Sequence, residues 1–196
     1  TTEEYTLQIN GETVDLQEIQ QKWEATLEPV YPRITKAPQE TVPTYNYQCV
    51  ERKTSSIKLA QPRVLIPVFP GTNCEIDTKR AFEKAGAETE ILVVQNLCAK
   101  DIEYTIDRME KAIRSSQIIM IPGGFSGGDE PEGSAKFIAA FFRNPAITEA
   151  VHTLLRQRDG LMLGICNGFQ ALIKLGLVPY GEIRPITAEC PTLTFN

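Results

Sequence analysis

Histidine is almost absent from this sequence, which contains only His152, and this scarcity limits where a catalytic base could come from. There is no run near the ~18 apolar residues of a membrane span, and no basic-then-apolar N-terminal signal. Basic residues form no cluster, and the net charge is -5, which argues against nucleic-acid binding. We therefore expect a cytoplasmic protein that binds neither a membrane nor a nucleic acid.

Paired cysteines are also missing. The chain has five cysteines, an odd number, and they are widely spaced with no C-x-x-C motif. This pattern favours a reducing compartment and argues against a disulfide framework or a structural zinc site. The length of 196 residues allows one good core and a small appendage.

The first region, residues 1–32, has the pattern of a hairpin followed by a helix. Apolar residues alternate before an Asn10-Gly11 turn, and Asp15 with Glu18 three residues later resembles a capping box. The helix presents one apolar face: Leu16, Ile19, Trp23 and Leu27. We expect a small α+β unit that packs on another surface. Residues 33–62 are rich in Pro, Thr, Ser and Gln and are predicted to be a linker.

From Arg63 onward, short apolar runs alternate with amphipathic segments, which is typical of an α/β protein with a parallel sheet. The expected strands are 64–69, 89–94, 117–121 and 161–165, and the last is expected to be buried. Helices are expected between and after these strands, one of them starting at Asp101. Pro67 is awkward in a central strand, so the first strand should be irregular there. We predict an open sheet with helices on both faces across residues 63–196.

Cys166 lies between the last strand and a helical pattern, with Gly164 and Gly168 two residues away on either side. This spacing predicts a nucleophile elbow with Cys in place of Ser. The strained turn needs neighbours without Cβ atoms, and the first helical amides favour the thiolate. The alternative is an inert buried cysteine in a βα turn.

A glycine-rich loop, Gly123 to Asp129, follows the third strand. It lacks the spacing of a nucleotide loop, and we favour a role in which one of its amides completes an oxyanion hole with Asn167. A merely flexible loop is the alternative. The segments 70–74, 122–129 and 165–168 should meet at the carboxyl edge of the sheet. Cys74 is interpreted as a small residue at a helix start.

His152 is expected on the outer side of its helix, far from the strand ends, so the sequence offers no convincing base for Cys166.

Three motifs together resemble the class I glutamine amidotransferase domain of the phosphoribosylformylglycinamidine synthase family. They are Gly164-Ile-Cys166-Asn-Gly168-Phe-Gln170, Pro122-Gly-Gly-Phe-Ser126-x-Gly-Asp129 and Pro70-Gly-Thr-Asn-Cys74. The resemblance runs from about Arg63 to the C-terminus and implies a flavodoxin-like sheet. Residues 1–32 resemble, more weakly, the tail of the synthetase region in the long, single-chain form of that enzyme.

The resemblance implies specific roles. Cys166 would attack the side-chain amide of glutamine and form a thioester. The backbone amides of Gly124, Phe125 and Asn167 would hold the oxyanion, and Gln170 would contact the bound glutamine. Ammonia would pass to the synthetase domains of the same enzyme, where ATP and Mg²⁺ act on formylglycinamide ribonucleotide in purine biosynthesis. No cofactor is expected within this chain.

Two departures from the family pattern matter. The usual aromatic position in the glycine loop is Gly127, and the family's downstream H-x-E stretch has no counterpart, because no histidine follows Cys166. We therefore expect a truncated domain with little or no activity of its own. A DJ-1/PfpI-like Cys-elbow hydrolase and a non-catalytic interaction module remain as alternatives.

Overall fold

The computed structural model describes residues 4–30, 44, 46, 48, 51, 54–125 and 135–193. The chain divides into two compact units, Thr1–Glu51 and Arg52–Asn196. The boundary falls inside the segment 33–62.

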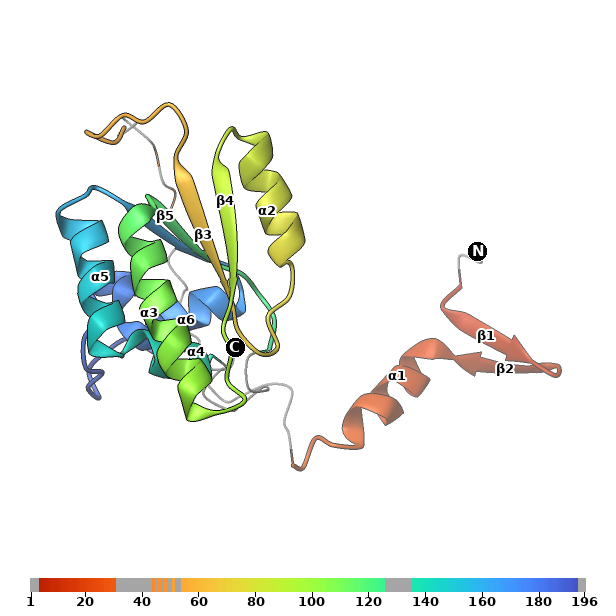
Figure 1. Cartoon of the computed structure of the whole chain (residues 1–196). Helices are drawn as coiled ribbons and strands as arrows, with labels where there is room; N and C mark the ends of the chain where they lie inside the picture. The colour runs from red at the N-terminus through yellow and green to blue at the C-terminus, as the bar shows by residue number, and fades with distance from the viewer. Residues whose placement is uncertain are drawn as a thin grey trace. The chain divides into compact units, whose positions relative to one another are not determined.

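The first unit is a hairpin followed by a short helix (Figure 1). Strands β1 (Thr6–Ile9) and β2 (Glu12–Asp15) pair antiparallel around Asn10 and Gly11, both of which have positive φ. Helix α1 (Leu16–Ala25) begins where Asp15 Oδ1 accepts a 2.7 Å hydrogen bond from the Gln17 amide. The hairpin and the N-cap are thus confirmed.

The predicted capping box is not formed in this unit, because the Glu18 carboxylate pairs with Lys22 at 2.6 Å. The apolar face of α1 is exposed: Trp23 is 78% exposed.

The second unit contains a four-stranded parallel sheet with the order β4-β3-β5-β6 (Figure 1). Its strands are β3 (Arg63–Val68), β4 (Glu88–Val93), β5 (Ile118–Ile121) and β6 (Leu161–Gly164). Its helices are α2 (Glu75–Lys84), α3 (Ala99–Ser115), α4 (Lys136–Phe142), α5 (Pro145–Arg156), α6 (Asn167–Leu175) and α7 (Leu177–Tyr180). The predicted α/β class and parallel sheet are confirmed.

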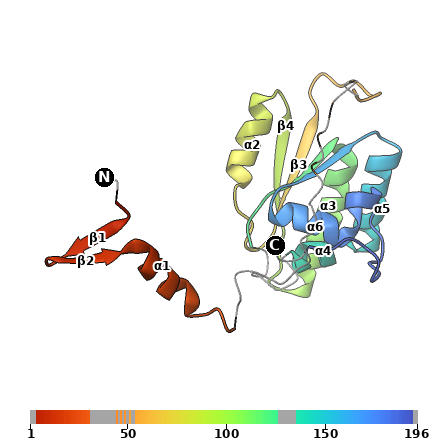
Figure 2. The same cartoon turned by 180° about the vertical axis from the view of Figure 1, so that it is seen from behind.

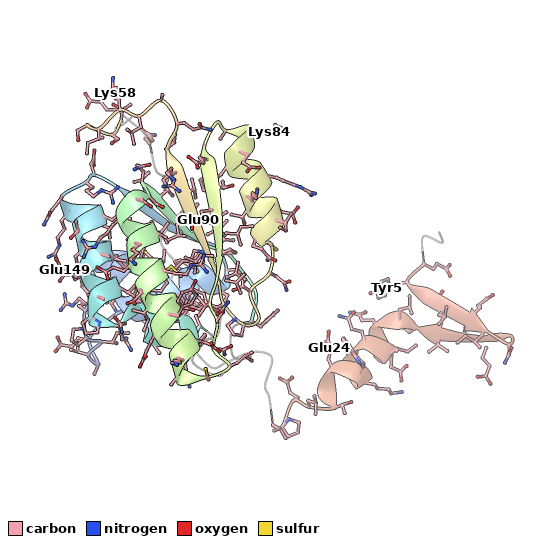
Figure 3. All side chains as sticks on the ribbon, in the orientation of Figure 1. Tyr5, Glu24, Lys58, Lys84, Glu90 and Glu149 are labelled. Carbon is pink, nitrogen blue, oxygen red and sulfur yellow. The ribbon has the colours of Figure 1, made fainter. Side chains whose placement is uncertain are left out.

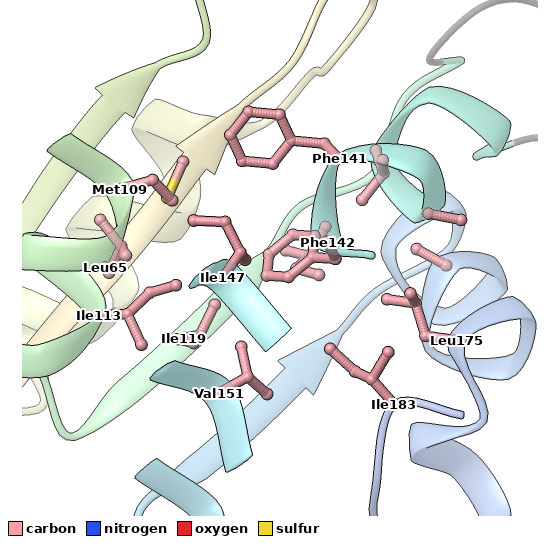
Figure 4. Close-up of a cluster of buried hydrophobic side chains, with 14 of the residues drawn as sticks. Leu65, Met109, Ile113, Ile119, Phe141, Phe142, Ile147, Val151, Leu175 and Ile183 are labelled. Carbon is pink, nitrogen blue, oxygen red and sulfur yellow. The ribbon is translucent and has the colours of Figure 1, made fainter. Parts of the chain in front are cut away.

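Helices cover both faces of the sheet, as Figures 1 and 2 show. The larger core joins one face to α3, α4, α5 and α6, and Figure 4 shows Leu65 and Ile119 of the strands beside Ile113 of α3 and Val151 of α5. A smaller cluster lies on the other face under α2, around Val64, Ile66, Ala87 and Met120. Charged side chains such as Lys84 and Glu149 lie on the outside (Figure 3).

The irregularity expected at Pro67 is present. β3 pairs with β4 along its whole length, but its ladder with β5 comprises only Val64–Ile118 and Leu65–Ile119. Because proline has no N–H to donate, a full central ladder through this position is not available.

Two predictions were wrong in detail. Helix α3 begins at Ala99, because Asp101 is the third helical residue of a capping box, in which its carboxylate accepts from the Cys98 amide at 3.1 Å. Strand β6 was expected to be buried, yet Leu161 is 63% and Leu163 45% exposed. Among the strands that the structure describes, β6 pairs only with β5, and α2 contacts β3 and β4 rather than this end of the sheet.

Candidate active site at the β6–α6 turn

The loops that follow β3, β5 and β6 meet at the carboxyl edge of the sheet, as predicted. Thr72 and Gly124 form an antiparallel bridge, in which Asn73 N donates to Gly123 O at 2.8 Å. A Cβ atom placed on Gly123 would lie 3.4 Å from the Cβ of Cys166. The glycine loop is therefore hydrogen-bonded to the loop after β3 and packed against the turn that contains Cys166.

Cys166 is exposed at the turn between β6 and α6, with φ 52° and ψ -108°. This conformation is strained for a residue with a side chain, and such strain is common at catalytic turns. The flanking glycines are required by close approach, because a Cβ on Gly164 would stand 2.5 Å from the carbonyl carbon of Gly168. The elbow geometry predicted from the spacing is thus present.

Two backbone N–H groups of the glycine loop, those of Gly124 and Phe125, point in different directions. The Phe125 amide donates to Gly71 O at 2.9 Å and thereby holds the loop to the segment after β3. In this type of bridge the N–H of Gly124 points away from Thr72, because the ladder bonds are made by the residues on either side. Gly124 has φ 129°, a conformation that favours glycine. The rest of the predicted loop, residues 126–129, lies outside the described residues.

Asn167 and Gln170 both lie in the first turn of α6. The side chain of Asn167 is buried and donates from Nδ2 to Gln170 Oε1 at 3.2 Å. The main chain of Gln170 continues the helix by donating to Cys166 O at 2.9 Å. The pair thus fixes the Gln170 amide directly beyond the nucleophile, where the sequence placed it.

His152 has a structural contact. Its Nε2 accepts a 3.0 Å hydrogen bond from the Ile183 amide. This bond holds the segment that follows α7, a partner that the helical pattern alone did not indicate.

Cys74 occupies the N-cap position of α2 with φ 69°, without a capping hydrogen bond from its side chain, and it is exposed. Thr72, two residues earlier, shapes the same loop, since its hydroxyl accepts from the Phe69 amide at 3.0 Å. In the described part of the chain, no group of three His, Cys, Asp or Glu side chains is arranged to hold a metal ion. No helix within the described ranges is both long and apolar enough to cross a membrane.

A family model for the CobB/CobQ-like glutamine amidotransferase domain matches residues 61–196. The chain belongs to this family. The match begins just before β3, so it covers the whole parallel sheet and the Cys166 elbow and leaves out the N-terminal hairpin unit.

The chain is also similar to curated proteins named phosphoribosylformylglycinamidine synthase subunit PurQ. The protein from Dehalococcoides mccartyi is 38% identical over 121 residues, which cover 62% of this chain and 43% of that protein. The protein from Archaeoglobus fulgidus is 31% identical over 132 residues, covering 67% of this chain and 46% of its own length. The chain therefore spans less than half the length of these relatives.

Among solved structures, the chain is similar to the one titled PurLQS from Thermotoga maritima. The TM-score is 0.40 at 30% sequence identity, and the match covers 60% of this chain and 45% of that one. The relatives are named as a subunit, so the long single-chain arrangement expected from the sequence stays a prediction.

Proposed function

We propose that Cys166 is the nucleophile of a glutaminase and that this glutamine amidotransferase domain supplies ammonia for the synthesis of phosphoribosylformylglycinamidine. The observation that carries the proposal is the strained, exposed elbow of Cys166, which lies within a region matched by the amidotransferase family. The similarity to PurQ proteins supports the choice of reaction.

The proposed reaction has two halves. The Cys166 thiolate attacks the side-chain carbonyl carbon of glutamine, and the amide nitrogen takes up a proton and leaves as ammonia. Water then attacks the resulting thioester, which releases glutamate and restores the thiol. In this proposal the N–H groups of Gly124 and Asn167 stabilise the oxyanion of each half.

The sequence predicted that the Phe125 amide would bind the oxyanion, and the structure gives this amide another partner. Because its amide donates to Gly71 O, it acts in this proposal by holding the loop, while the Gly124 N–H faces the oxyanion. Gln170 contacts the substrate from the first turn of α6, where its side chain is oriented by Asn167.

The ammonia acceptor in this proposal is a synthetase that carries the ATP and Mg²⁺ sites and converts formylglycinamide ribonucleotide to its amidine. In this proposal the two activities share one polypeptide, and residues 1–32, which lie outside the family match, are the tail of the synthetase region. We also propose that residues 1–196 alone turn over glutamine slowly or not at all. General-base catalysis needs a proton carrier near the sulfur. The sole histidine, His152, instead accepts a hydrogen bond from the Ile183 amide.

The test uses 6-diazo-5-oxo-L-norleucine, a glutamine analogue whose electrophilic carbon labels an activated cysteine. Mass spectrometry of residues 1–196, and of a version extended to the length of the relatives, should find the label on Cys166 and not on the exposed Cys98. Glutamine should protect Cys166, and only the extended protein should release ammonia, with Cys166→Ala abolishing release. Equal labelling of Cys98 and Cys166 in both proteins, without protection by glutamine, would exclude the proposal and favour an interaction module. Ammonia release by residues 1–196 that His152→Ala abolishes would show that the base is His152.

A further inference from the structure

A cavity of about 530 Å³ lies beside the C-terminal end of α6, the end opposite to Cys166. Its lining combines two cations, a hydroxyl and an apolar wall: Arg143, Arg184, Thr148, Ile183, Pro185 and Ile186. Nine helical residues, or ~13 Å of helix, separate this cavity from the elbow. It is therefore distinct from the site of the proposed glutaminase.

Both guanidinium groups of the cavity are held in place by groups other than carboxylates. Arg143 donates from Nη2 to the carbonyl oxygen of Lys174 at 2.7 Å. The Arg184 guanidinium carbon lies 4.2 Å from the centre of the Tyr180 ring. Across the described ranges, neither arginine has a carboxylate oxygen within 4.0 Å, so most of their ten N–H donors stay open to a ligand.

The backbone behind the two arginines is also fixed. The Ile183 amide donates to His152 Nε2 at 3.0 Å, and the Arg184 amide donates to Leu175 O at 3.0 Å. The Ile183 side chain is buried in the main core beside Leu175 and Val151 (Figure 4). A segment anchored in this way presents Arg184 in a defined position, which reduces the entropy that ligand binding would cost.

The charge balance around the cavity favours an anion. The chain as a whole is acidic, with a net charge of -5, whereas the described residues that line this cavity include two arginines and no carboxylate. The nearby Glu182 does not neutralise them, because its carboxylate is paired with Arg156. Two like charges that line one cavity repel each other, and an oxyanion between them would relieve that repulsion.

We propose that this cavity binds a small molecule that carries a phosphate or carboxylate group. The oxyanion lies between Arg143 and Arg184 and accepts paired N–H bonds from the guanidinium groups. The Thr148 hydroxyl donates its proton to the carbonyl oxygen of Phe142 at 2.9 Å, so the two guanidinium groups are the donors to the anion. The organic body of the ligand lies along Ile183, Pro185 and Ile186, of which Ile186 is 44% exposed. The site does not depend on the chemistry proposed for Cys166.

A simpler function exists for each arginine by itself. Arg143 caps the last turn of α6, and Arg184 stacks on Tyr180, and both contacts stabilise a fold without any ligand. These functions explain each position singly, but they do not require both guanidinium groups to line the same cavity. The experiment therefore has to separate ligand binding from folding.

Binding is measured by titrating residues 1–196 with inorganic phosphate, phenyl phosphate and benzoate while amide resonances are followed by NMR. We expect phenyl phosphate to bind more tightly than inorganic phosphate, with the largest shifts at Thr148, Ile183 and Arg184. Arg143→Gln and Arg184→Gln should each weaken binding by about tenfold or more. The matched control is Arg108→Gln, because Arg108 also lies over a tyrosine ring, that of Tyr104 at 5.7 Å, but lines no part of this cavity.

The outcomes decide the question even if a variant folds poorly, because the wild-type shifts map the site without substitution. Tighter binding of phenyl phosphate than of benzoate identifies a phosphate ligand, and the reverse order identifies a carboxylate. An absence of saturable shifts at the cavity with all three probes would overturn the proposal. Binding that Arg108→Gln weakens as much as Arg143→Gln does would show only non-specific attraction to surface arginines and would also overturn it.

Discussion

Gly168 lies against the backbone of Ile121, so closely that a Cβ added to it would stand 2.1 Å from the Ile121 carbonyl oxygen. The helix that follows Cys166 therefore packs directly on β5, and only glycine allows this approach. This contact fixes where α6 begins relative to β5 and therefore the position of the Cys166 turn.

We expect Gly168→Ala to destabilise the second unit by about 3 kcal/mol, because the rigid backbone of Ile121 cannot move aside. Gly181→Ala is the matched control: Gly181 has φ 72° with no atom within 4 Å of the added methyl, so only backbone strain of about 1 to 2 kcal/mol applies. Urea unfolding followed by circular dichroism measures both changes. Gly168→Ala should also change the alkylation rate of Cys166, whereas Gly181→Ala should not, and equal effects on Cys166 would contradict the packing argument.

The uncovered end of the sheet at β6 leads to a second prediction. Leu65→Ala should cost about 2 to 5 kcal/mol, because Leu65 is fully buried. Leu161→Ala, in the same sheet but 63% exposed, should cost less than about 1 kcal/mol. A loss at Leu161 as large as that at Leu65 in the same urea assay would mean that this face is covered in solution, and gel filtration would then show whether self-association covers it.

Asp159 gives a prediction on pH. Hydrogen bonds from the Ser56 amide, the Ser56 hydroxyl and the Ser55 hydroxyl hold the pKa of the Asp159 carboxyl below its ordinary value of 3.8. Because the pKa of Asp159 is lowered in the folded state, the ionised carboxylate stabilises the fold, and this stabilisation is fully present at pH values above the ordinary pKa of 3.8. It is lost as the pH falls through the lowered pKa.

The Ser56 amide resonance should therefore shift with a midpoint below 3.8. Asp159→Asn should remove that transition, whereas Asp77→Asn, a surface substitution on α2, should leave it unchanged. A midpoint at or above the ordinary value would show that the three hydrogen bonds do not persist in solution.

Hydrogen bonds around Cys190 favour the ionised form of its thiol. The Thr187 hydroxyl, the Thr187 amide and the Tyr180 hydroxyl lower the pKa of Cys190 from its ordinary 9.0, since each stabilises the thiolate. Thr187→Val removes the hydroxyl and should move the iodoacetamide reactivity of Cys190 to higher pH. Peptide mass spectrometry across a pH series measures the midpoint, and Thr192→Val in the same segment serves as control. An unchanged midpoint in Thr187→Val would contradict the assigned cause.

The sequence predicted the order of strands and helices well because their apolar periodicity is local. It failed at the start of α3, since Cys98 is not a usual N-cap residue and the capping box was visible only in space. It also failed on the burial of β6. Apolar runs of four or five residues look alike in a central and an edge strand, and burial depends on how many elements surround the strand.

At the candidate site, the spacing of Gly164, Cys166 and Gly168 was sufficient to predict the elbow, because the required close approaches lie within one short turn. The bridge between Thr72 and Gly124 could not be predicted in the same way. It consists of backbone hydrogen bonds between segments distant in sequence, and backbone groups carry no residue-specific signal.

That bridge also bears on where ligands can enter. In a sheet with the order β4-β3-β5-β6, the chain reverses its direction of winding between β3 and β5, and such a reversal normally opens a ligand crevice there. Here the loops that leave β3 and β5 are joined backbone to backbone at the mouth of that crevice. For the proposed glutaminase, we therefore expect glutamine to bind one strand further along the sheet, above β5 and β6, where Cys166 is exposed.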